Sequence, residues 1–574
     1  MRAIESLMEL RRRTFITLVL GTIATAVAVA ASSYFGIASR PRRTMKSTTS
    51  GMIESTTGHP RAEVDITVDS SKVVGRLDSS LWANIGYDPI FSGTVAPEAK
   101  LAWDLLRENK PLRYVRCHNM FSDTTPGQPE NRIYGCRVYA EDEAGSPVYN
   151  WNYLDQVLDT WLSVGLRPIL EADFMPDKLA EGAIVRNYSG GAINTPRDYW
   201  KWRNLIYETV KHCKERYGAE EIRKWYWEIW NEPDLKTYFI DGLDPAAKEK
   251  FTPSKVARFN KMYDYFVDGV TAAEKDTKVG GPGIAGNEDY LTAFLDHCVK
   301  GRNEVTHEEG TRIDFISWHT YGNTNATLAK NRAIRKLIET QFPSLMDREL
   351  QQNEWGQQLR INGIPTRSDS VYTEYEAAFL CRYVDAILSN PSARVHKFLR
   401  WGQITGAGMG WRTLTGRIGS GIYRTAVLNA YEMLAKLGDE MVELSGPDYS
   451  DPVHGIAART GSGSVQALIY HFDENDTEST GTSRHVQVNF HGLAHYGGVR
   501  LTHYRIDKQH SNPYAFWIEA GKPSRLSHEL SESMRTQSEL QTVEGVEMLW
   551  SGQNLVASFE LPVNACSLLV LEPA

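Results

Sequence analysis

Short apolar segments alternate with longer amphipathic stretches eight times between Leu81 and Leu437. This alternation is typical of the strand–helix units that build a parallel sheet. Eight such units predict an α/β fold, a (β/α)₈ TIM barrel over residues 81–437, which is a length that this fold commonly has. A doubly wound open sheet would need a glycine-rich phosphate turn after an early strand, and the sequence has none. The predicted strands are LWANIGY (81–87), LRYVRCH (112–118), LRPILEA (166–172), WYWEIWN (225–231), KVGGPGI (278–284), DFISWHTY (314–321), ELQQNEW (349–355) and HKFLRWG (396–402).

The chain changes character after the predicted helix TAVLNAYEMLAKLG (425–438). It continues with short alternating runs such as SVQALIYHF (464–472), separated by turn residues. We therefore predict an accessory β-sandwich domain over residues 438–574. The earlier segment EVDITVDSS (63–71) alternates in the same way, and we expect strands within residues 61–80 to join this sandwich.

The N-terminus has the composition of an export signal or a membrane anchor. Arg11–Arg13 precede an apolar segment that extends from Phe15 to about Ala31. Arg12 and Arg13, followed by a variable residue and two apolar ones, resemble a twin-arginine signal. The apolar segment is nearly long enough to span a bilayer, so both a cleaved signal and a retained anchor in contact with the membrane stay open. We assign residues 1–38 to this signal or anchor and residues 39–60 to a polar linker, and we expect a periplasmic, secreted or membrane-anchored protein.

Charge and cysteine content exclude several classes of partner. The formal net charge of −8 provides no basic surface for nucleic acid. The six cysteines show no CxxC or His pairing of the kind that binds zinc. Cys117 and Cys136 are near enough in sequence for a disulfide in an exported protein, but spacing alone leaves that pairing open.

Polar and aromatic residues collect where the predicted strands end. In this fold, active sites are assembled at the carboxyl ends of several different strands, so the common placement of these residues indicates a site. Any one of them taken alone has an equally good structural explanation. They are Arg116, His118, Glu171, Asn231, Glu232, His319, Tyr321, Glu354 and Trp401.

Two acids on opposed strands suit glycoside hydrolysis. Glu232 follows the fourth predicted strand and Glu354 lies in the seventh, so the two can face each other across a closed barrel. One carboxyl would donate a proton to the leaving oxygen and the other would act as an ionised carboxylate. A separation of about 5–5.5 Å predicts retention and one of about 6.5–9.5 Å predicts inversion, and the sequence leaves both open.

Asn231-Glu232-Pro233 after strand four, together with Glu354 after strand seven, resembles glycoside hydrolase family 39, which contains β-xylosidases and α-L-iduronidases. The resemblance extends from about residue 65 to the C-terminus. It implies a retaining, exo-acting enzyme that releases a sugar from the non-reducing end of an oligosaccharide or glycoside. The other matching segments are GLRPILEADFMPDKLA (165–180), DFISWHTYG (314–322), LNAYEMLAKLGDE (428–440) and YRIDKQHSNPYAFW (504–517).

The resemblance also implies a role for each residue at the strand ends. Glu232 would be the general acid/base and Glu354 the nucleophile, and Asn231 would hydrogen-bond the 2-OH of the sugar. Because side chains would do both the proton transfer and the attack, the resemblance implies neither a metal nor an organic cofactor. The remaining substrate-binding group would comprise Arg116, which holds the charge of Glu354, His319 and Tyr321 beside the nucleophile, and His118, Glu171 and Trp401 around the glycone.

The glycone is expected to be neutral. A uronic acid substrate calls for Lys or Arg in the glycone pocket, and this chain has Thr320 and Tyr321 after His319, where iduronidases carry basic residues. This favours a β-xylosidase acting in xylan degradation, although Arg360 on a loop could reverse that choice. The segments HNMFSD (118–123) and QQNEWGQ (351–357) depart from the xylosidase pattern. The alternatives are an α-L-iduronidase-like or other family 39 glycosidase, an inactive carbohydrate-binding protein, and an adhesin that uses the barrel as a scaffold.

Overall fold

The computed structural model of the protein describes residues 64–573, apart from 89, 108–110, 124–133, 188, 241–251, 358–359, 362–363, 366–368, 403–409 and 494–497. The predictions for residues 1–38 and 39–60, and for the start of 61–80, lie outside the described residues. Within the described part, no helix is both long and apolar enough to cross a membrane.

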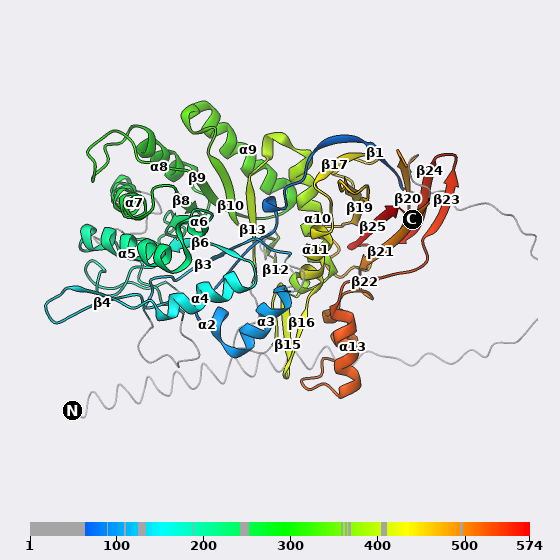
Figure 1. The fold of residues 1–574 in the computed structure, drawn as a ribbon, viewed down its shortest axis with the longest axis horizontal. Coiled ribbons are helices and arrows are strands. Elements are labelled where there is room, and N and C mark those ends of the chain that lie inside the picture. The colour runs from blue at the N-terminus through cyan, green and yellow to red at the C-terminus, as the bar shows by residue number, and fades with distance from the viewer. Residues whose placement is uncertain are drawn as a thin grey trace, which may run out of the picture. The chain divides into compact units, whose positions relative to one another are not determined.

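Eight parallel strands close into the predicted barrel (Figure 1), which confirms the fold class. Each pairs in parallel with its neighbour in the sequence order of the strands, and β13 pairs with β2 to close the ring. The predicted strand positions are confirmed within a few residues. The strands are β2 (Asn84–Tyr87), β3 (Tyr114–Cys117), β6 (Arg167–Ala172), β7 (Tyr226–Ile229), β8 (Lys278–Ile284), β9 (Phe315–Tyr321), β10 (Glu349–Gly356) and β13 (Lys397–Trp401).

Amphipathic helices lie outside the barrel strands (Figure 1). Several begin at a side chain that accepts a hydrogen bond from a backbone N–H of the first turn, as Asp198 does for α5 and Asn287 for α8. Their apolar faces are buried against the strands, because that is the stripe each helix must remove from water. The helices are α2 (Ser92–Val95), α3 (Pro97–Arg107), α4 (Asn152–Ser163), α5 (Tyr199–Tyr217), α6 (Ala219–Ile222), α7 (Pro253–Ala273), α8 (Glu288–Lys300), α9 (Thr324–Gln341), α10 (Glu374–Ser389) and α11 (Ala426–Ala435).

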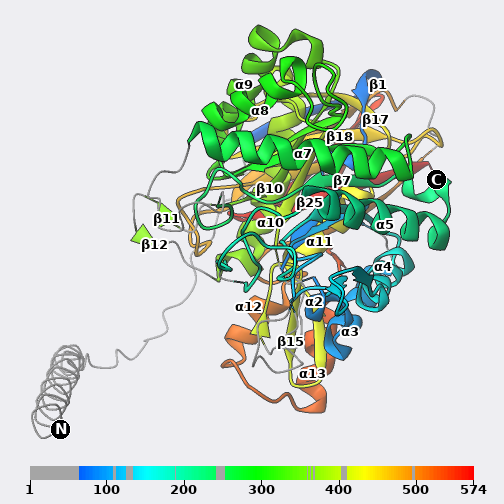
Figure 2. The same ribbon diagram turned by 90° about the vertical axis from the view of Figure 1, so that its left-hand side faces the viewer.

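Short excursions decorate the barrel. The hairpin of β4 (Tyr139–Glu141) and β5 (Pro147–Tyr149) precedes α4, and β11 (Arg360–Ile361) pairs with β12 (Ile364–Pro365). A third small sheet connects β13 to α11 and packs beside α12 (Pro513–Glu519) and α13 (His528–Ser538), as Figure 2 shows. Its strands are β14 (Gly410–Trp411), β15 (Thr415–Ile418) and β16 (Gly421–Arg424).

The C-terminal region forms a ten-stranded mixed sheet in the order β22-β21-β25-β19-β18-β17-β1-β20-β24-β23. Strand β1 (Val64–Arg76) precedes the barrel in sequence, yet it pairs in parallel with β20 and antiparallel with β17. The chain therefore passes through this sheet before it enters the barrel. The other strands are β17 (Glu440–Ser445), β18 (Val453–Arg459), β19 (Val465–His471), β20 (Arg484–His491), β21 (Val499–Ile506), β22 (Gln541–Thr542), β23 (Glu547–Ser551), β24 (Asn554–Leu561) and β25 (Ala565–Pro573).

This sheet folds around its own apolar core. Val488 in β20 and Ala557 in β24 belong to the same buried cluster as Ala467 in β19 and Leu569 in β25, although β18, β17 and β1 separate these two strand pairs in the sheet order. Side chains on one face of both halves therefore meet, as in a sandwich.

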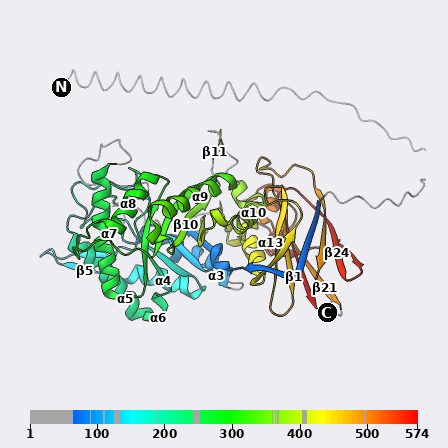
Figure 3. The same ribbon diagram turned by 90° about the horizontal axis from the view of Figure 1, so that it is seen from above.

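The other face of the sheet packs against the barrel through α10, which Figure 3 shows between the two. Leu568 in β25 belongs to the same buried cluster as Phe379 in α10. Beside them, the buried carboxylate of Asp385 in α10 accepts hydrogen bonds from the Tyr470 hydroxyl at 2.7 Å and from His454 Nδ1 at 2.5 Å. Barrel and sheet form one compact unit with a shared core.

The cysteines are all free and buried, so Cys117 and Cys136 form no disulfide in this structure. Cys117 Sγ instead donates to the carbonyl oxygen of Tyr87 at 2.8 Å.

Replacing Leu568 with alanine should lower the free energy of unfolding by about 2–5 kcal/mol, because it opens a cavity in the shared core. Urea unfolding followed by tryptophan fluorescence should show one transition moved to lower urea. Leu549→Ala is the matched control, because Leu549 is 69% exposed and its truncation should change stability by less than about 0.5 kcal/mol. A separate early transition in Leu568→Ala would contradict a shared core.

Candidate active site

The chain leaves strand β7 through a strained turn that carries Glu232 into the mouth of the barrel. Trp230 and Glu232 have φ angles of 59° and 44°, a left-handed region that L residues rarely adopt. The Glu232 backbone N–H donates to the Gly283 carbonyl at 2.9 Å, which holds the turn against the end of β8. The position of Glu232 is thus fixed by the ends of two neighbouring strands, β7 and β8.

Glu232 and Glu354 face each other across His319. The Nδ1 of His319 lies 2.9 Å from Glu232 Oε1 and 3.5 Å from Glu354 Oε2. A carboxylate oxygen of Glu232 and one of Glu354 lie within 4.8 Å of each other. The Glu232 side chain retains more exposure than that of Glu354, 13% against 6%. The two acids thus share one small space at the carboxyl ends of β7, β9 and β10.

Arg116 lies fully buried beneath this pair and is surrounded by acids. Its Nη1 donates to Glu354 Oε1 at 3.0 Å and its Nε donates to Glu228 Oε2 at 2.7 Å. Its Nη2 forms an ion pair with Glu171 at 2.5 Å and donates to Asn231 Oδ1 at 3.2 Å. Burial alone lowers the pKa of Arg116, but the charges of Glu171, Glu228 and Glu354 outweigh that effect and raise it. The guanidinium is therefore a permanent cation that orients Glu354 and Asn231 at the mouth of the barrel.

Glu354 is held in its ionised form. Burial by itself raises the pKa of this carboxyl, but His319, His118 and Arg116 outweigh burial and hold the pKa well below its usual range. The Tyr321 hydroxyl also donates to Glu354 Oε2 at 2.8 Å, from a ring that is 41% exposed. This carboxylate is fixed by donors on both oxygens and has the charge that a nucleophile needs.

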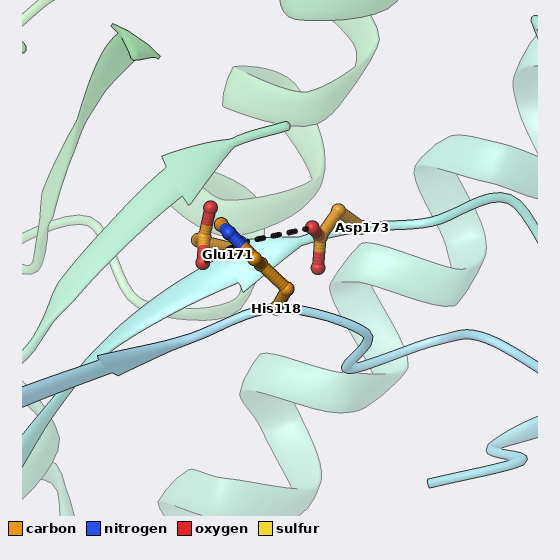
Figure 4. Close-up of side chains that lie close together, drawn as sticks. All are labelled: His118, Glu171 and Asp173. Atoms are coloured by element: carbon orange, nitrogen blue, oxygen red, sulfur yellow. Dashed lines mark hydrogen bonds and ion pairs between the residues drawn. The ribbon is translucent and has the colours of Figure 1, made fainter. Parts of the chain in front are cut away.

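His118 connects Glu354 to a second pair of acids. Figure 4 shows its imidazole beside Glu171 and Asp173, which extend from the end of β6. Its Nδ1 lies 2.9 Å from Glu171 Oε2 and 3.8 Å from Asp173 Oδ2, and its Nε2 lies 3.2 Å from Glu354 Oε1. Burial lowers the pKa of His118, but Glu171 and Glu354 outweigh burial and raise the pKa well above its usual value. Both ring nitrogens therefore act as donors.

Two groups here have the residue types of a metal site: His118 with Glu171 and Asp173, and Glu232 with His319 and Glu354. In the first, both ring nitrogens of His118 already face carboxylates, Nδ1 that of Glu171 and Nε2 that of Glu354. In the second, the three side chains are already held to one another by the contacts at His319. The arrangement suits proton transfer and nucleophilic attack by side chains.

Asp173 is a further buried acid that sequence reasoning missed. Its Oδ1 accepts the backbone N–H of Asn119 at 2.8 Å, while burial and the charge of Glu171 raise its pKa well above the usual range. Glu228 was missed as well, although it is the one charged residue in the buried segment WYWEIW. An acid within a strand that is buried on both faces was the available signal.

The structure brings all nine predicted residues together at one end of the barrel. Arg116 contacts Glu354, as its expected role requires, and its side chain and that of Glu171 have no exposed surface because they form an ion pair with each other. Substrate contact by Arg116 and Glu171 stays a prediction. The buried atoms Asn231 Nδ2 and His319 Nε2 have no hydrogen-bond partner among the described residues.

Trp401 forms one wall of the site at the end of β13. Its ring centroid lies 4.5 Å from that of His118 and 5.8 Å from Arg116 Cζ. Gly86 in β2 makes room for it, because a Cβ at that position would lie 2.2 Å from the indole ring. The side chain of Arg360, which we considered as a possible contact for a sugar carboxylate, lies outside the described residues.

The lowered pKa of Glu354 predicts an acid-dependent part of the protein's stability. A carboxyl whose folded pKa is below its unfolded value of about 4.5 stabilises the fold above that pH, and this contribution is lost as the pH falls toward the folded value. Between pH 6 and pH 3 the wild type should lose more free energy of unfolding than Glu354→Gln, as measured by urea unfolding. Equal losses in the two proteins would contradict the assignment.

Comparison with known proteins places the chain in a family. The chain matches the model of Glycosyl hydrolases family 39 over residues 64–554. It is 26% identical over 463 residues to a β-xylosidase of Geobacillus stearothermophilus, covering 75% of this chain and 81% of that protein. It is 24% identical over 499 residues to an α-L-iduronidase of Mus musculus, covering 79% of this chain and 72% of that protein.

A solved structure shows the same fold. The crystal structure of a monomeric β-xylosidase from Caulobacter crescentus CB15 superposes with a TM-score of 0.70 at 21% identity, covering 89% of this chain and 99% of that one. The family match includes every strand of the barrel and most of the ten-stranded sheet. On this evidence the chain belongs to family 39 of the glycosyl hydrolases.

Proposed function

We propose that this glycosidase is a retaining, exo-acting β-xylosidase in which Glu354 is the nucleophile and Glu232 the general acid/base. The observation that carries the proposal is the approach of the two carboxylates, one oxygen of each lying within 4.8 Å of the other. Retaining enzymes hold their two carboxyl groups about 5–5.5 Å apart, whereas inverting enzymes need about 6.5–9.5 Å to admit a water. The close approach of the two groups here supports the retaining mechanism.

The surroundings of the two acids support different roles. Glu354 is ionised and fixed by Arg116, His118 and Tyr321, so it can attack the anomeric carbon. Glu232, the more exposed acid, donates its proton to the glycosidic oxygen as that bond breaks. It then removes a proton from the water that hydrolyses the glycosyl-enzyme. Asn231 uses its free Nδ2 to bind the 2-OH of the sugar.

The charges at the site support a neutral glycone. Arg116 and His118 already face carboxylates, and Arg400 forms an ion pair with Glu376 at 2.5 Å and donates to the Trp401 carbonyl. A sugar carboxylate would need a further cation to replace the water it loses on binding. A xylose unit has no such requirement. The similarity to a mouse α-L-iduronidase makes an iduronide the second candidate.

We also propose that residues 1–38 direct export of the enzyme, because basic residues precede an apolar segment there. Fractionation of cells that express the full chain and a chain starting at residue 59 tests this. Only the full chain should leave the cytoplasm.

Initial rates on aryl β-D-xyloside, α-L-arabinoside and α-L-iduronide test the glycone. The chain starting at residue 59 should hydrolyse the xyloside fastest, with iduronide poorest because its carboxylate would enter a site whose cations are taken. A preference for iduronide would overturn the xylosidase proposal and leave the mechanism in place. No turnover on any of the three would favour a binding protein.

Separate substitutions of the two acids distinguish their roles. Glu354→Gln should abolish turnover of every substrate. Glu232→Gln should lower kcat/KM by about 10²–10⁴-fold for poor leaving groups and much less for activated aryl groups, because only the former need protonation. Added azide should restore turnover in Glu232→Gln and yield the glycosyl azide of retained configuration. Glu288→Gln, on an exposed helix, is the control and should keep wild-type rates.

A further inference from the structure

We propose that Glu228 is a positioning residue that holds both catalytic glutamates at their working separation. This rests on the roles proposed above for Glu232 and Glu354. Glu228 lies within strand β7, has no exposed surface and does not reach the substrate space. It acts through the residues that it binds.

Three donors from three different strands converge on this carboxylate. Arg116 Nε in β3 donates to Oε2 at 2.7 Å. Asn353 Nδ2 in β10 donates to Oε1 at 2.6 Å, and the Ser317 hydroxyl in β9 donates to the same oxygen. An ionised carboxylate is the side chain that can accept from all three, because it presents only acceptors.

The first connection leads to Glu354. The pairing of β10 with β9 shifts its register between Gln352 and Glu354, so Asn353 is the extra residue of a β-bulge. A bulge re-aims the side chains beside it, and here it precedes the nucleophile. Glu228 binds the side chain of this bulge residue, and through Arg116 it also fixes the guanidinium that contacts Glu354.

The second connection leads to Glu232. The pairing of β8 with β9 shifts between Pro282 and Ile284, which makes Gly283 the extra residue of a second bulge. The Gly283 N–H donates to Ser317 Oγ at 2.9 Å, and its carbonyl accepts the N–H of Glu232 at 2.9 Å. Its φ of 60° favours glycine, and a Cβ there would lie 3.3 Å from Glu228 Oε1. Glu228 is therefore connected to both bulges, directly at Asn353 and through Ser317 at Gly283.

The amide of Glu228→Gln must direct an NH₂ at one group of donors. If it faces Arg116, the contact that orients the guanidinium is lost; if it faces Ser317 and Asn353, both bulges lose their acceptor. Displacing a catalytic group by about 1 Å can cost about 10²-fold in rate. In either orientation the positioning of Glu354 is disturbed, through Arg116 or through the Asn353 bulge, so the rate should fall for good and poor leaving groups alike.

The test measures two quantities separately: the fraction of enzyme molecules with a competent active site, and kcat/KM per competent site. A 2-deoxy-2-fluoro aryl glycoside, built on whichever glycone the wild type prefers, labels each competent site as a stable glycosyl-enzyme, and mass spectrometry gives the labelled fraction. We expect Glu228→Gln to label fully but to show kcat/KM per labelled site about 10²-fold lower. Asp264→Asn is the matched control: Asp264 is a fully buried acid on α7 that accepts from His297 at 2.8 Å, and its loss should lower stability without changing the rate per site.

Ser317→Ala separates the two connections in case Glu228→Gln folds poorly. It removes the link to the Gly283 bulge and leaves Arg116 bound, so its loss should be greater for poor leaving groups, which depend on Glu232. An unchanged rate per labelled site in Glu228→Gln, or equal losses for both leaving groups in Ser317→Ala, would overturn the positioning role. A wild type that hydrolyses no glycoside tested overturns the proposed function and this inference together.

Discussion

The buried guanidinium of Arg116 is the interaction on which the active site depends. A permanent cation inside a barrel is costly unless its charge is compensated and its N–H groups are paired. Here the compensation comes from Glu171, Glu228 and Glu354, on three other strands of the barrel. Removing any one of these partners leaves buried charge uncompensated. The charges of Arg116 and its three acidic partners therefore depend on one another.

Local departures from regular strand geometry set the positions of the two acids at the mouth of the barrel. Regular parallel strands would point alternate side chains into the barrel at fixed heights. The bulges at Gly283 and Asn353, and the left-handed turn at Glu232, change those heights just where the two acids must meet. The surrounding hydrogen bonds outweigh the backbone strain, which is the usual condition for strain at a functional site.

The ten-stranded sheet supports the same barrel from outside. Helix α10 follows the strand that carries Glu354, and it shares its apolar core with β25 and its buried Asp385 with β18 and β19. Strand β1 enters this sheet before the barrel begins. The sheet and the barrel therefore share one core. This argues against the hypothesis of an adhesin in which the barrel serves only as a scaffold for the sheet.

The order of strands and helices, the closed barrel and the acids at its mouth could all be predicted from the amino-acid sequence. These features could be predicted because the spacing of apolar residues along the chain indicates which side chains are buried. In addition, the carboxyl ends of all strands in this fold meet at one end of the barrel. Glu232 was found from the Asn-Glu-Pro triplet, and Glu354 from its place in the seventh strand. The burial of Arg116 with Glu171, and the ion pair of Arg116 with Glu228, became apparent only in the folded structure. Which side chains meet inside a closed barrel depends on register and bulges between strands far apart in sequence, and these arise from long-range pairing that no local pattern records.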